Sequence, residues 1–81
     1  MIEEHERRRM LRAYSIGPRM IAYLEEIGVE RLDDLVDADP HEIAMRIDIV
    51  LGTRRLNRFG IEALQNLIEL AGRECRLGLP R

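Results

Sequence analysis

Signals that start or stop a helix recur along this chain at intervals of roughly ten residues. Pro18 and Pro40 suit the first position of a helix, where the missing N–H of proline is not needed. Asp39, directly before Pro40, is a good N-cap residue, and Gly28 and Gly52 are good helix terminators. Between these signals the apolar residues repeat every three or four positions, which is the period of a helix. The chain is therefore predicted to fold into several short helices.

These helices are expected to form one all-α domain, a compact, SAM-like orthogonal array of four or five short helices. They are predicted at residues 3–14, 18–28, about 32–36, 40–52 and 58–72. The domain is taken to span residues 1–81, with ends at 1–5 and 73–81 that are expected to fray. The predicted core consists of aliphatic residues from each helix: Leu11, Ile16, Ile21, Leu24, Ile27, Leu35, Ile43, Ile47, Leu51, Leu64, Leu67 and Ile68.

The size and composition of the chain favour a binding module over an enzyme. Its 81 residues bury one modest core and leave no room for a catalytic domain with a deep pocket. Apolar residues make up 46% and charged residues 35%, the balance of an ordinary globular domain. The aromatic residues are Tyr14, Tyr23 and Phe59, and this scarcity favours helices and argues against a platform for base stacking. We therefore expect no catalytic activity.

The residue types that hold metals and cofactors are sparse. The single cysteine, Cys75, cannot form an internal disulfide, leaves too few thiols for a cysteine-rich zinc site, and suits a reducing cytoplasm. His5 and His41 lack the spacing of metal ligands, and the central acids do not follow a calcium-binding loop. No stretch reaches the ~18 apolar residues of a membrane span. We expect a cytoplasmic protein with no metal, no cofactor and no membrane partner.

The charges are distributed unevenly. Residues 1–24 carry five arginines against three glutamates, residues 25–48 carry nine acids against two arginines, and residues 49–81 carry six arginines against three glutamates. The net charge is −2, whereas dedicated nucleic-acid binders are usually basic overall. A fold that brings the two ends of the chain together would nevertheless have one basic face and one acidic face.

A motif occupies the junction between the first two predicted helices. It runs Tyr14, Ser15-Ile16-Gly17, Pro18-Arg19, and then Ala22 and Leu24 on the second helix. This pattern resembles the helix-hairpin-helix family, whose core is a hydrophobic residue, Gly-hydrophobic-Gly, a polar residue or proline, and then Ala and Leu. Ser15 replaces the first glycine of that core, at a position that often needs an unusual backbone angle.

The downstream sequence LEEIGVERLDDLVDADP extends the resemblance. It is similar to the segment that follows such hairpins in bacterial pathogenicity-locus helix-hairpin-helix proteins and in the C-terminal domains of TfoX-type competence regulators and of the RNA polymerase alpha subunit. The resemblance covers about residues 10–72 and implies binding of DNA, of proteins or of both. A weaker helix, hairpin and helix pattern at residues 41–72 suggests a degenerate second hairpin near Gly52-Thr53.

A hairpin of this kind predicts a phosphate site. A tight turn at a helix N-terminus leaves backbone N–H groups unpaired, and the helix dipole adds positive potential there. The predicted nucleic-acid contacts combine the hairpin with nearby arginines: Ser15, Ile16, Gly17, Arg19, Met20, Arg12, Arg54, Arg55 and Arg58. Because phosphate contacts carry no sequence information, duplex or structured DNA would be bound with low specificity.

The alternative is a protein–protein interaction module, which the negative net charge favours. Its working surface would be the acidic central segment or a homodimer surface. Arginines gathered around the hairpin would favour DNA, whereas scattered arginines or a contiguous exposed apolar patch would favour a protein partner. The sequence leaves open whether the chain is a monomer or a homodimer.

Overall fold

A computed structural model of the chain describes residues 1–52 and 56–76. These residues form no strand. The elements are four α-helices and one short 3₁₀ helix: α1 (Glu4–Met10), α2 (Pro18–Glu26), η1 (Leu32–Leu35), α3 (Pro40–Leu51) and α4 (Arg58–Arg76). The predicted all-α class, built from a few short helices, is confirmed.

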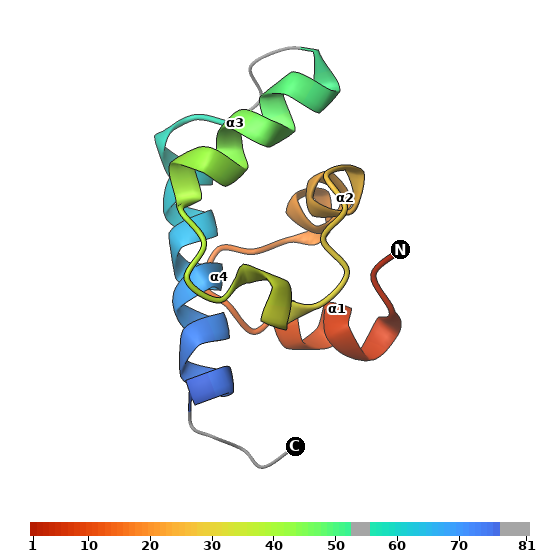
Figure 1. Cartoon of the computed structure of the whole chain (residues 1–81), viewed down its shortest axis with the longest axis vertical. Helices are drawn as coiled ribbons and strands as arrows, with labels where there is room; N and C mark the ends of the chain where they lie inside the picture. The colour runs from red at the N-terminus through yellow and green to blue at the C-terminus, as the bar shows by residue number, and fades with distance from the viewer. Residues whose placement is uncertain (53–55, 77–81) are drawn as a thin grey trace.

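The longest helix, α4, runs along the length of the molecule, and the other elements lie beside it (Figure 1). α3 and η1 pack directly against α4, α2 packs against α3, and α1 packs against η1. The connection from α1 to α2 passes the middle of α4 (Figure 1), where the Asn66 side chain donates a hydrogen bond of 3.1 Å to the Tyr14 carbonyl oxygen. This contact fixes the connection against α4.

The core lies between α4 and the shorter elements. Its largest fully buried side chains come from every helix: Met10, Leu24, Leu32, Leu35, Ile47, Leu64 and Leu67. They gather because residues three or four apart share one face of a helix, and each helix turns that face inward. Among the predicted core residues, Leu51 and Ile68 are only partly buried. Leu11 is exposed, because α1 ends before it.

Several predicted helix boundaries are confirmed. The Asp39 side chain accepts a hydrogen bond of 2.9 Å from the His41 amide, which makes Asp39 the N-cap of α3. Gly52 ends α3 with a φ of 75°, and Gly28 follows α2 with a φ of 90°. Both angles lie in the left-handed region that glycine adopts without a steric cost.

Two boundaries were predicted wrongly. α1 stops at Met10 and not at residue 14, because the chain turns away from the helix there and the Ala13 amide bonds to the Met10 carbonyl oxygen at 3.0 Å. α4 continues through Gly72 to Arg76. Its buried face still includes Ala71, directly before that glycine. Packing of this face outweighs the weak helix propensity of glycine.

The structure also orders the first residues of the chain. Ile2 is buried, and its amide donates a hydrogen bond of 2.9 Å to the Glu25 carboxylate on α2. Residues 1–5 and 73–81 were expected to fray. Within these ends, Ile2 is anchored to α2, and residues 73–76 belong to α4. Residues 77–81 lie outside the described part of the chain.

Glu6 is a buried charged side chain that joins α1 to η1. Its carboxylate accepts a hydrogen bond of 2.9 Å from the Leu32 amide, at the start of η1. It also accepts bonds of 3.0 and 3.2 Å from Arg9 Nη1. The amides at the start of a helix need acceptors, and here a side chain from a distant element supplies one. This link fixes α1, and with it the connection that leads to α2.

Candidate nucleic-acid interface

The connection between α1 and α2 turns sharply at Ser15. Ser15 adopts a φ of 68°, in the left-handed region that a residue with a side chain disfavours. Ile16 is buried, and its amide donates a hydrogen bond of 3.3 Å to the Ala13 carbonyl oxygen. The Ile16 amide is thus already engaged, and it drops out of the predicted set of phosphate donors.

The first turn of α2 presents unpaired backbone donors. Gly17 is extended, with a φ of −126° and a ψ of −179°, and no side chain caps the helix. Within residues 1–52 and 56–76, the amides of Gly17, Arg19 and Met20 have no hydrogen-bond acceptor. The first amide of α2 that bonds back is that of Ile21, to the Gly17 carbonyl oxygen at 3.3 Å. Three of the predicted donors are therefore open.

The side chain of Arg19 lies beside these amides. It is exposed, and it forms no ion pair with any residue that the structure describes. Ser15, also exposed, adds a hydroxyl group at the same turn. Ser15, Gly17, Arg19 and Met20 all line the same hollow in the surface.

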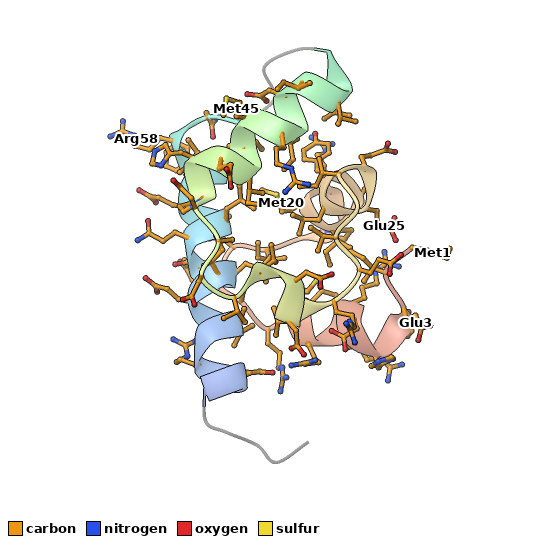
Figure 2. The ribbon with its side chains drawn as sticks, in the orientation of Figure 1. Met1, Glu3, Met20, Glu25, Met45 and Arg58 are labelled. Carbon is orange, nitrogen blue, oxygen red and sulfur yellow. The ribbon has the colours of Figure 1, made fainter. Side chains whose placement is uncertain are left out.

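A groove of about 390 Å³ separates the first turn of α2 from the beginning of α4. It is lined by the connection and by both helices: Tyr14, Ser15, Gly17, Arg19, Met20, Tyr23, Leu56, Asn57, Phe59, Gly60, Glu62, Ala63 and Asn66. Figure 2 shows Met20 between α2 on one side and α3 and α4 on the other. At the start of α4, the Asn57 side chain accepts a hydrogen bond of 3.1 Å from the Gly60 amide. Two helix N-termini therefore open on one groove, and both add positive potential to it.

All the aromatic residues of the chain line this groove. Tyr14 is 81% exposed and Phe59 is 73% exposed, whereas Tyr23 packs against the core. The sequence did not reveal the cluster, because the three residues lie on different elements and no spacing rule connects them. The exposed rings run against the expectation that this chain offers no surface for base stacking.

Arg12, a predicted phosphate contact, lies elsewhere and is paired. Its Nη2 atom is 2.8 Å from the Glu74 carboxylate, near the C-terminal end of α4. Arg9 contacts the same carboxylate at 3.3 Å. Burial alone would lower the pKa of Arg9, but hydrogen bonds and the charges of Glu6 and Glu74 raise it above its ordinary value. Arg9 and Arg12 thus neutralise acids of the protein itself.

Of the remaining predicted arginines, the structure describes Arg58. Arg58 begins α4 but does not line the groove, and Figure 2 shows it on the side of α4 away from α2. Arg58 is 16 positions before Glu74 on α4, which places it ~24 Å along the helix axis from the acid that holds Arg12. Arg54 and Arg55, with the second candidate hairpin, lie outside the described residues.

An exposed apolar face on α3 forms a second candidate surface. Met45 is 56% exposed, Ile49 is 71% exposed and Val50 is 50% exposed. A shallow hollow beside them is lined by Ile49 and Val50 together with Arg46 and residues 26–28 of the α2 end. Met45 and Ile49, four residues apart, share one face of α3, and exposed apolar side chains that lie together are a feature of protein-interaction surfaces.

Other kinds of site find little support in the described residues. They hold no group of three or more His, Cys, Asp or Glu side chains placed to bind a metal ion. No helix among them has the length and apolar character needed to cross a membrane. Comparison of the chain with protein-family models, with curated proteins and with solved structures finds no match. The geometry of the groove therefore carries the functional argument.

Proposed function

We propose that the chain is a non-catalytic, cytoplasmic DNA-binding module that holds a backbone phosphate at the first turn of α2. The observation that carries this proposal is that, within residues 1–52 and 56–76, the amides of Gly17, Arg19 and Met20 and the exposed guanidinium of Arg19 have no partner. Unpaired N–H groups at a helix N-terminus form a ready anion site, and an adjacent arginine adds charge and two parallel donors.

Such a site accounts for DNA binding by a chain with a net charge of −2. The positive potential is local, because it comes from one arginine and two helix N-termini and not from the overall charge. The contacts would reach phosphate oxygens and not base edges, so duplex or structured DNA would bind with little sequence preference. Of the predicted contacts that the structure describes, Ser15, Gly17, Arg19 and Met20 line the groove, which supports the proposal.

The test is fluorescence anisotropy of a labelled duplex titrated with the protein at low and moderate salt. We expect binding that weakens as salt rises, because counterions are released from each neutralised phosphate. Arg19→Glu should abolish binding at ~50 mM salt, since it replaces the free cation by a carboxylate at the anion site. Absence of binding by the unchanged protein at that salt would overturn the proposal.

Arg12→Glu is the matched control for Arg19→Glu, because both substitutions change the net charge by the same amount. Both residues are exposed arginines near the same connection, but Arg12 is held by Glu74 at 2.8 Å. Its removal should change the affinity for DNA by less than about 3-fold, because an exposed ion pair contributes at most about 1 kcal/mol of free energy. An equal loss in the two variants would show that the effect follows from overall charge and not from the α2 site.

A second candidate function is a protein–protein contact, and the exposed face of α3 is the observation that favours it. Met45, Ile49 and Val50 together resemble the apolar centre of an interface more than scattered surface residues. For a homodimer built on this face, sedimentation velocity should show the mass per particle rising with concentration. Ile49→Glu should then restore the monomer. A monomer at every concentration would exclude the homodimer.

A further inference from the structure

We propose that the groove between α2 and α4 takes an unpaired nucleotide, with its base against the rings of Tyr14 and Phe59 and its phosphate at the first turn of α2. The inference rests on the proposed function and specifies the form of DNA. It predicts a preference for single strands, or for duplexes with an unpaired end, over a fully paired duplex.

The exposed rings carry the first part of the argument. Tyr14 and Phe59 come from segments that are far apart in sequence, yet both line one groove and both keep more than two thirds of their surface exposed. A single exposed ring is ordinary on a protein surface. Here every aromatic residue of the chain lies at the same groove, and Tyr23 supports it from the core side. Flat apolar rings of this kind offer a stacking surface for any base.

The charge of the groove carries the second part. The α2 end is positive, because Arg19 and the open amides of Gly17 and Met20 lie there. Glu62 is the carboxylate among the lining residues, and it belongs to the α4 side. The groove thus combines an anion site with neighbouring aromatic rings. A nucleotide matches both, because its phosphate suits the anion site and its base suits the rings.

The volume of the groove and the polar side chains that line it are consistent with a bound nucleotide. A groove of about 390 Å³ falls within the ~300–1,000 Å³ of sites that hold small organic ligands. Asn57 and Asn66 line it as well, and their side-chain amides provide polar groups near the rings. An acidic peptide would use the anion site but would gain little from two flat rings, so the rings favour a nucleotide.

The experiment compares a labelled blunt duplex with the same duplex carrying a single-stranded thymidine overhang, again by anisotropy. We expect the overhang to tighten binding by at least about 5-fold, because stacking one base on an aromatic side chain typically strengthens binding by roughly 5- to 150-fold. Phe59→Ala and Tyr14→Ala should each reduce this preference and leave blunt-duplex binding intact. Tyr14→Phe should keep the preference, since the ring remains.

Two further variants separate this inference from the proposed function. Leu11→Ala removes an exposed apolar side chain that does not line the groove, and it should leave the affinity for both probes unchanged. Arg19→Glu should weaken both probes. Duplex binding without any preference for the overhang, or a preference that survives Phe59→Ala and Tyr14→Ala, would overturn the inference and leave the phosphate site standing. If the protein bound neither probe, both the proposed phosphate site and the proposed nucleotide groove would be overturned.

Discussion

Ser15 holds a left-handed backbone angle, with a φ of 68°, at the turn that leads into the groove. Glycine would adopt this angle without the clash between Cβ and the following carbonyl group. We expect Ser15→Gly to raise the free energy of unfolding by about 0.5–1 kcal/mol, because the relieved strain exceeds the added entropy of the unfolded chain. Thermal denaturation followed by circular dichroism should show an increase in Tm of roughly 2–8 °C.

Ser15→Ala is the control for this substitution. It removes the hydroxyl group, as glycine does, but it keeps the Cβ atom that causes the strain. Ser15→Ala should therefore not raise the Tm. If both variants were stabilised equally, the hydroxyl group and not the backbone angle would be the cause.

Glu6 provides the second prediction at this scale. Its buried carboxylate satisfies the Leu32 amide and pairs with Arg9, so Glu6→Ala leaves a backbone donor without its acceptor and leaves Arg9 with Glu74 and Asp33 alone. We expect a loss of about 3 kcal/mol in the free energy of unfolding, measured by urea denaturation. Glu6→Gln should cost less, because the amide oxygen can still accept from Leu32.

The control for Glu6 lies on the same helix. Glu4 pairs with Arg8 at 3.3 Å, but both side chains are largely exposed. Glu4→Ala should change the free energy of unfolding by no more than about 0.5 kcal/mol, as is usual for exposed pairs four residues apart. A similar loss for Glu4→Ala and Glu6→Ala would argue that helix α1 as a whole, and not the buried carboxylate, sets the cost.

Residue patterns predicted the backbone of the candidate site better than its side chains. The order Ser15-Ile16-Gly17-Pro18 was enough to place a turn and a helix N-terminus, because glycine and proline have strong local preferences. The partner of Arg12 was not predictable, since Glu74 is 62 residues away in sequence. For the same reason the bond between Glu6 and the Leu32 amide, 26 residues apart, was not predictable.

At the scale of the elements, α3 shows how a local signal fixes a helix. Asp39 accepts a hydrogen bond of 2.9 Å from the His41 amide and so satisfies one of the free donors at the start of α3. Asp39→Ala should lower the free energy of unfolding by about 1 kcal/mol, and Asp39→Asn should restore most of it. Urea denaturation measures both. Equal losses in the two variants would point to the charge near the helix dipole and not to the cap.

The elements that the sequence predicted poorly are those set by tertiary packing. A helix was expected at about 32–36, and the structure has the four-residue 3₁₀ helix η1 there, with Leu32 and Leu35 both fully buried. α4 extends past Gly72 because Leu70 and Ala71 still pack against the core. Neither outcome follows from local propensity, which tertiary contacts override.

At the scale of the whole molecule, acids and arginines of the described residues meet where the two ends of the chain come together. Arg9 lies near Glu6, Asp33 and Glu74, and Arg12 shares Glu74 with it. The two ends of the chain do come together, as the connection of residues 11–17 lies against α4, but they bring acids as well as arginines. Counting charges along the sequence missed this pairing, because it depends on which helix faces meet.

This pairing predicts a shallow salt dependence for DNA binding. Each phosphate that a protein neutralises contributes ~0.9 to the slope of log K against log salt for duplex DNA. Among the described arginines, Arg19 lines the groove whereas Arg9 and Arg12 are engaged by Glu74, so we expect one or two phosphates to be neutralised and a slope of roughly −1 to −2. Anisotropy titrations over a salt series measure it.

Glu74→Gln tests the reason for that slope. The substitution removes the carboxylate that holds Arg9 and Arg12, which lie away from the groove, so the slope should stay where it is and affinity should rise only slightly. A slope steeper than about −4 for the unchanged protein would mean that these ion pairs open on DNA and that their arginines join the contact surface. In that case the binding face would extend from the start of α2 down to the C-terminal end of α4, and the groove would be one part of it.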